Sequence, residues 1–140
     1  MMEESMKLSN ELLDFIQKSP SCYHAVENLA QTLCDTGFLE LSEGALWRLQ
    51  RGGRYFIRRN LSSLLAFKIP EGEIRGFQIA ASHSDSPTFY VKNDALEGDK
   101  RYVRRAVEGY GCMNCASWQD RPLTVAGRAV VRTPAGVEGR

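Results

Sequence analysis

The spacing of apolar side chains changes from helical to strand-like near Gly37, and this change constrains the fold more than any other feature. Apolar residues recur every three or four positions from Leu8 to Ile16, where Ser19-Pro20 ends the pattern, and again from Tyr23 to Asp35. Beyond Gly37 the pattern predicts strands at Arg54–Arg59, Ser63–Ile69 and Phe77–Ser82, the last of them buried. Two helices followed by several strands predict an α/β sheet.

The second part of the chain predicts shorter strands and a change of segment. Strands are expected at Thr88–Lys92, Tyr102–Glu108 and Leu123–Arg132. Residues 93–100 are polar and include Gly98, so we place a boundary there, with an α/β domain over residues 1–92 and an all-β segment over residues 93–140. Residues 133–140 are turn-forming, and so short a β-segment buries little apolar surface alone. We therefore expect a truncated chain, the N-terminal part of a longer protein.

The run His83-Ser84-Asp85-Ser86-Pro87 closes the apolar strand and holds the better placed of the two histidines. An imidazole at the end of such a strand lies where open α/β sheets place their sites. Asp85 points the same way as His83 if the backbone stays extended, because side chains alternate with period two. Its carboxylate could accept one ring N–H and leave the other nitrogen for a metal ion. A hydrogen-bonded histidine and an Asx-type turn at Asp85 are the alternatives that these residues leave open.

The charge balance gives no reason to expect a nucleic acid or a membrane surface as partner. Eighteen Lys and Arg stand against seventeen Asp and Glu, a net charge of +1. No apolar run approaches the roughly 20 residues of a membrane helix, and the acidic start lacks the pattern of a secretion signal. We expect a cytoplasmic protein whose four cysteines are free thiols.

Five runs of sequence carry a family resemblance: Ser19–Val26, Arg59–Phe67, Ala81–Pro87, Val107–Gly111 and Trp118–Arg128. In this order they resemble the aspartyl aminopeptidase family of zinc metallopeptidases, in its bacterial form. The resemblance implies a zinc-peptidase-like mixed sheet flanked by helices, with an inserted β-domain that begins near residue 93. It also implies an exopeptidase that removes N-terminal residues from peptides with two divalent metal ions, usually zinc, and that forms a large homo-oligomer.

The resemblance assigns roles to two residues of this chain. His83 would be a metal ligand, and Asp85 would be the catalytic-site residue that orients it. The remaining ligands and the general base would lie beyond this chain. The loop Tyr110–Cys115 departs from the bacterial pattern, and Ala116 stands where eukaryotic members carry a histidine that reaches a neighbouring subunit. The preferred N-terminal residue and the metal loaded are therefore left open.

Two functions from different classes follow. The first is a metalloaminopeptidase that hydrolyses peptides with a metal-activated water, of which this chain holds only part of the site. The alternative is a non-catalytic truncated homologue that acts through subunit pairing. A dithiol redox module at Cys112 and Cys115 is a weaker third, because the pair lies between predicted strands and not at a helix start.

Overall fold

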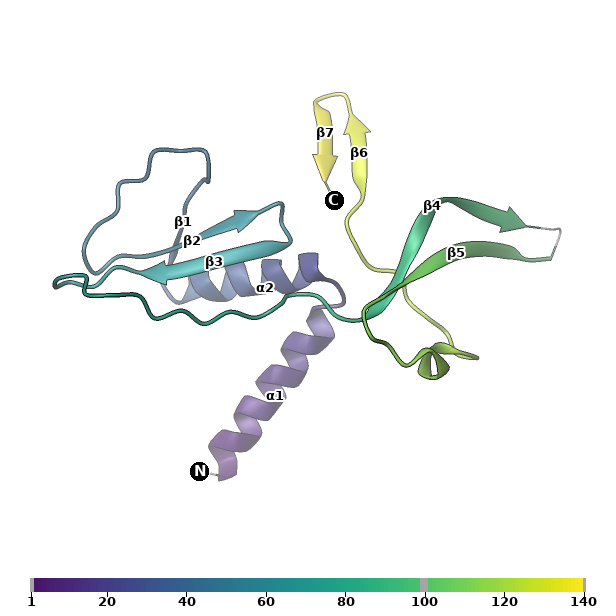
Figure 1. Ribbon diagram of the computed structural model, residues 1–140, viewed down its shortest axis with the longest axis horizontal. Coiled ribbons are helices and arrows are strands. Elements are labelled where there is room, and N and C mark those ends of the chain that lie inside the picture. The colour runs from purple at the N-terminus through teal and green to yellow at the C-terminus, as the bar shows by residue number, and fades with distance from the viewer. Residues whose placement is uncertain (1, 99–100, 140) are drawn as a thin grey trace. The chain divides into compact units, whose positions relative to one another are not determined.

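The computed structural model describes residues 2–98 and 101–139, which form two compact units (Figure 1). One unit contains the residues up to Asp85 and those from Ala126 onward, and the other contains Ser86–Val125. The elements are, in chain order, α1 (Met2–Lys18), α2 (Cys22–Asp35), β1 (Leu39–Glu40), β2 (Arg54–Arg59), β3 (Ser63–Lys68), β4 (Thr88–Gly98), β5 (Val103–Tyr110), the 3-10 helix η1 (Cys115–Trp118), β6 (Val130–Thr133) and β7 (Gly136–Gly139).

Both expected helices are present. Helix α1 ends at Lys18, before Ser19-Pro20, and α2 ends at Asp35, with Gly37 in the left-handed conformation (φ +83°) that commonly follows a helix. Helix α1 contacts α2 and no other described helix or strand, so its apolar stripe stays exposed. No helix in the described ranges is both long and apolar enough to cross a membrane.

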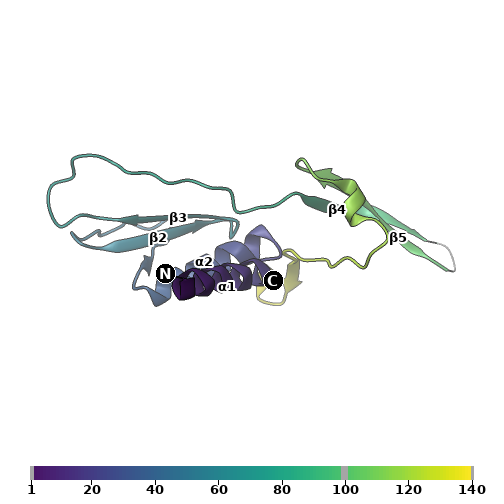
Figure 2. The same ribbon diagram turned by 90° about the horizontal axis from the view of Figure 1, so that it is seen from below.

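The first unit contains a mixed sheet of order β1-β2-β3. Strand β1 runs parallel to β2, with Leu39 opposite Tyr55, and β2 runs antiparallel to β3. Helix α2 lies on one face of this sheet (Figures 1 and 2). The expected α/β class, with a mixed sheet and flanking helices, is thereby confirmed. The two-residue strand β1 was not expected, because a pairing so short leaves no periodic pattern in the sequence.

The core of the described residues is small and lies between α2 and the sheet. The buried apolar side chains are Ala25, Val26, Ala30, Tyr55 and Phe56. Successive strand residues point to opposite faces, and both faces of β2 are covered at this point. The Tyr55 ring packs against Phe67 at 5.7 Å between centroids, and its hydroxyl accepts a hydrogen bond from the Gln50 amide at 2.9 Å. Phe56 points to the face that α2 covers and is fully buried.

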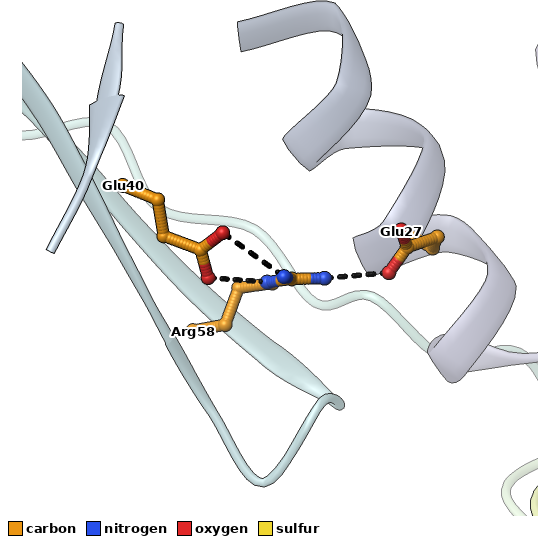
Figure 3. Close-up of polar contacts among 3 residues, drawn as sticks. All are labelled: Glu27, Glu40 and Arg58. Atoms are coloured by element: carbon orange, nitrogen blue, oxygen red, sulfur yellow. Dashed lines mark hydrogen bonds and ion pairs between the residues drawn. The ribbon is translucent and has the colours of Figure 1, made fainter. Parts of the chain in front are cut away.

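Arg58 lies two residues beyond Phe56 on the same face and joins three elements (Figure 3). Its Nε and Nη2 donate to the two carboxylate oxygens of Glu40 on β1 at 2.7 and 3.0 Å. Its Nη1 donates to Glu27 on α2 at 2.5 Å. These contacts raise the pKa of Arg58, with the hydrogen bond to Glu40 as the largest cause. The guanidinium therefore ties α2 to the sheet.

The expectation of a buried strand at Phe77–Ser82 is wrong for this structure. Residues 69–87 run as a trace without a strand arrow in Figure 1, and the Phe77 and Ile79 side chains are 90% and 84% exposed. A strand exists only through hydrogen bonds to a neighbour, and no described strand pairs with this segment. The apolar sequence of this segment favours a strand, but the described residues contain no strand that pairs with it.

The second unit is built on the antiparallel hairpin of β4 and β5, with Thr88 opposite Tyr110 and a shift of register between Val91 and Leu96. Strand β4 continues to Gly98, so the polar stretch in which we placed a segment boundary is strand from residue 93 up to that point. Residues 99–100 lie outside the described residues. Cross-strand pairing overrides polar composition here. The structure places a unit boundary after Asp85, and β4 continues through residue 93 without a break. An inserted domain that begins at residue 93 therefore stays a prediction.

The expected strand at Leu123–Arg132 is wrong in its first part. Only Val130–Thr133 forms a strand, β6, which pairs with β7 across a tight turn that begins at Thr133. Val125 is 86% exposed and has no strand beside it. Residues 133–139, which were expected to be turn-forming, thus make up most of the β6–β7 hairpin. Arg140 lies outside the described residues.

Replacing Gly111 with alanine is expected to destabilise the β4–β5 hairpin by about 1 kcal/mol, because a left-handed conformation is costly for a residue with a Cβ atom. Gly111 has φ +77°, and an added Cβ would lie 3.4 Å from the Pro87 ring. Gly109→Ala is the matched control, because its added Cβ meets only ordinary contacts at 3.9 Å. Amide hydrogen exchange in β4 and β5 measures the difference, and equal protection in the two variants would contradict this prediction.

Candidate functional site

The His83-to-Asp85 loop is the candidate site, and it follows directly on the extended segment that ends at Ser82. The Nδ1 atom of His83 lies 2.8 Å from the backbone carbonyl oxygen of Asp85 and 3.2 Å from its Oδ1. Both partners are acceptors, so Nδ1 must carry the proton in this arrangement. The neutral ring then presents an unprotonated Nε2, and the His83 side chain is 79% exposed.

The structure brings His83 and Asp85 together, but across a bend at Ser84 and not along an extended strand, and the shorter contact is to the Asp85 backbone. Asp85 is more sheltered, with its side chain 34% exposed. A histidine that binds metal through one ring nitrogen usually donates its other ring N–H to a carboxylate, a backbone carbonyl or water, and His83 Nδ1 has the Asp85 carbonyl as its hydrogen-bond acceptor. The same contacts also describe a hydrogen-bonded loop histidine. The ligand role of His83 and the orienting role of Asp85 remain predictions.

Ser84 is a residue of this loop for which sequence patterns predict no separate role. Its Oγ donates a hydrogen bond to the backbone carbonyl of Ser62, in the turn between β2 and β3, at 2.9 Å. The period of an extended chain gives no signal for this contact, because the backbone bends at Ser84. The acceptor could not be foreseen, because Ser62 is distant in sequence.

The second histidine, His24, lies on α2 and has a hydrogen-bond partner of its own. His24 forms a 2.7 Å hydrogen bond with the Ser21 hydroxyl at the start of α2 and lines an open pocket of about 170 Å³ with Tyr23, Glu27 and Arg128, among others. His83 does not line that pocket. All four cysteines are free thiols, as expected, and Cys112 and Cys115 are exposed.

The described residues supply part of a metal site and do not complete one. Within the ranges 2–98 and 101–139, no group of three or more His, Cys, Asp or Glu side chains could hold a metal ion. A catalytic zinc ion usually takes three protein ligands. The Nε2 of His83 fits one ligand, and Asp85 fits the acceptor that such a ligand needs behind it.

Comparison with known proteins places the chain among zinc metalloproteases. The model of the aminopeptidase I zinc metalloprotease family (M18) matches residues 15–139. The chain belongs to this M18 family, so the resemblance found in the sequence is confirmed.

Relatives match nearly the whole chain. It is 40% identical over 134 residues to the probable M18 family aminopeptidase 2 of Clostridium acetobutylicum, a match that covers 94% of this chain and 31% of that protein. It is 41% identical over 138 residues to the aspartyl aminopeptidase of Dictyostelium discoideum, covering 96% and 28%. The solved S. cerevisiae mApe1 dodecamer matches with a TM-score of 0.84 at 30% identity, covering 94% and 32%. The chain thus spans only 28% to 32% of the length of these proteins.

Proposed function

We propose that this chain is part of a zinc-dependent aminopeptidase that removes N-terminal residues from peptides, and that it supplies His83 as a metal ligand. Membership of the M18 family supports the reaction class. The observation that carries the site is the His83 ring itself, with Nδ1 held by Asp85 and a side chain that is 79% exposed. Nothing observed favours the non-catalytic alternative over the peptidase.

In this proposal each of the two residues has a separate task. His83 holds the metal through Nε2, and Asp85 fixes the ring tautomer and orientation through Nδ1. With zinc held there, the site would gain a Lewis acid for the scissile carbonyl and a source of activated water near neutral pH. We propose two zinc ions per intact site, as the resemblance implies, with the remaining ligands supplied by sequence outside the described residues.

We further propose that the whole protein is a cytoplasmic homo-oligomer. The match to a dodecameric relative supports the oligomer. Exposed apolar side chains, such as Tyr90 and Val103 on the β4–β5 hairpin and Phe77 in the unpaired segment, support additional protein surface around this chain. The neutral charge balance and the four free thiols support the compartment.

Zinc added to this chain is expected to shift the ring nitrogen signals of His83 and to leave those of His24 unchanged. Long-range ¹H–¹⁵N NMR spectra resolve the two histidines and report each ring nitrogen. One imidazole binds zinc weakly, so saturation should require millimolar metal. His24→Ala, the matched control, should preserve the shift of the His83 ring nitrogens. A zinc response confined to His24 would remove the basis of the proposed function.

The chain is also expected to release no N-terminal residues from peptides in the presence of zinc, because its described residues do not complete a metal site. A peptide cleavage assay followed by mass spectrometry checks this. Turnover that disappears in His83→Ala would show that the site is complete within the chain, contrary to expectation.

A further inference from the structure

The segment between Gly72 and Ser84, which leads to His83, makes few hydrogen bonds to the rest of the first unit. In the described part of the chain, the guanidinium of Arg51 holds the carbonyls of Glu71 and Gly72. After these contacts, the next hydrogen bond to another part of the first unit is the one from the Ser84 hydroxyl to Ser62. A free run of this length would let the loop move as a whole, because few contacts oppose local opening. The position of His83 therefore depends on what holds Ser84.

The acceptor of that bond lies in a well-defined turn between β2 and β3. Asn60 and Leu61 both adopt left-handed conformations, with φ of 52° and 58°. Such angles suit the two central residues of a tight hairpin turn, but leucine rarely adopts them. The Ser62 amide closes the turn on the Arg59 carbonyl at 3.2 Å. The Ser62 carbonyl is thus presented by a fixed piece of backbone.

A second contact holds the same turn. The Nη1 atom of Arg128 lies 3.2 Å from the Asn60 side-chain oxygen and 3.4 Å from the Asn60 carbonyl. Asn60 therefore receives a charged donor, and its left-handed backbone is supported from outside the hairpin. The turn is therefore held by contacts of its own, and it presents the Ser62 carbonyl to which the loop is hydrogen-bonded.

We infer that Ser84 is a positioning residue of the proposed metal site, acting through its hydrogen bond to the Ser62 carbonyl. Ser84 lies between His83 and Asp85, at a bend in the backbone. Anchoring it to the turn therefore holds the short piece of backbone that carries the imidazole and the carboxylate. The anchored loop keeps Nδ1 of His83 on Asp85 and keeps Nε2 available. This inference rests on the proposed function, to which it adds a residue that does not itself touch the metal.

The test is the tautomer of the His83 ring, which long-range ¹H–¹⁵N NMR reads without any metal at a pH where the ring is neutral. The unaltered chain should show a predominantly Nδ1-protonated ring. Ser84→Ala should move the ratio of tautomers to that of an unstructured peptide of residues 82–87. Ser84→Thr keeps the hydroxyl and should restore the ratio. Ser82→Ala, on the other side of His83, is the matched control and should have no effect.

The outcomes separate this inference from the proposed function. An unchanged tautomer ratio in Ser84→Ala would overturn the positioning role, whatever zinc does at His83. Loss of the β2 and β3 amide signals in Ser84→Ala would overturn it as well, because Ser84 would then hold the sheet and not the loop. A changed ratio, with a zinc response in the unaltered chain that is confined to His24, would support the positioning role and remove the metal role.

Discussion

Phe56→Ala is expected to unfold the β1-β2-β3 sheet together with α2. The Phe56 side chain is fully buried, and replacing a buried phenylalanine with alanine typically costs about 3–5 kcal/mol. Natural domains have only about 5–15 kcal/mol of stability. The core here consists of few residues, so the loss of its largest fully buried side chain should exceed what the unit can tolerate.

Phe77→Ala is the matched control for Phe56→Ala, since it removes the same side chain from a position that is 90% exposed. Its effect should stay within about 0.5 kcal/mol, as for most surface substitutions. Urea unfolding followed by far-UV circular dichroism compares the two variants. Equal losses of stability would mean that Phe77 is buried in solution and that the segment around it is a strand after all.

Arg58→Met is expected to destabilise the same unit by about 1–2 kcal/mol. Methionine retains the apolar stem but loses the paired hydrogen bonds to Glu40 and the bond to Glu27. Bidentate charged hydrogen bonds are stronger than ordinary surface pairs, and the Arg58 side chain is only 21% exposed. The loss should appear as faster hydrogen exchange in α2 as well as a lower urea midpoint, because the guanidinium joins the helix to the sheet.

Arg59→Met is the control, because Arg59 is the next residue, points to the other face and pairs with Glu43 from a side chain that is 74% exposed. Its effect should be small. The hydrogen bond to Arg59 lowers the pKa of Glu43. The Arg59–Glu43 pair therefore contributes to stability above the ordinary carboxyl pKa. This contribution is lost as the pH falls through the lowered pKa of Glu43. An Arg58→Met variant no less stable than Arg59→Met would contradict the tie between helix and sheet.

The helices and the first hairpin could be predicted because their signals are local. The repeat from Leu8 to Ile16, the stop at Ser19-Pro20 and the alternation in Arg54–Arg59 each act over a few residues, and the structure follows them. The proximity of His83 and Asp85 also followed from local geometry. The metal-ligand role of His83 is an implication of the family resemblance, and comparison with known proteins shows the family.

Some predicted strands are absent from the structure because a strand depends on its neighbours. Phe77–Ser82 has the composition of a buried strand but finds no partner in the described chain, whereas the polar residues after Lys92 pair with β5 and extend β4. Composition reports what a segment prefers, while the ladder of hydrogen bonds decides what it becomes.

Sequence periodicity alone predicts the helices of this protein and the strands of its first hairpin. Only the tertiary structure decided that the Ser62 carbonyl meets Ser84, that Arg58 joins α2 to the sheet and that Phe77 remains exposed. The reason is physical: periodicity arises from backbone geometry within a few residues. Contacts between distant segments depend instead on how the whole chain is brought together.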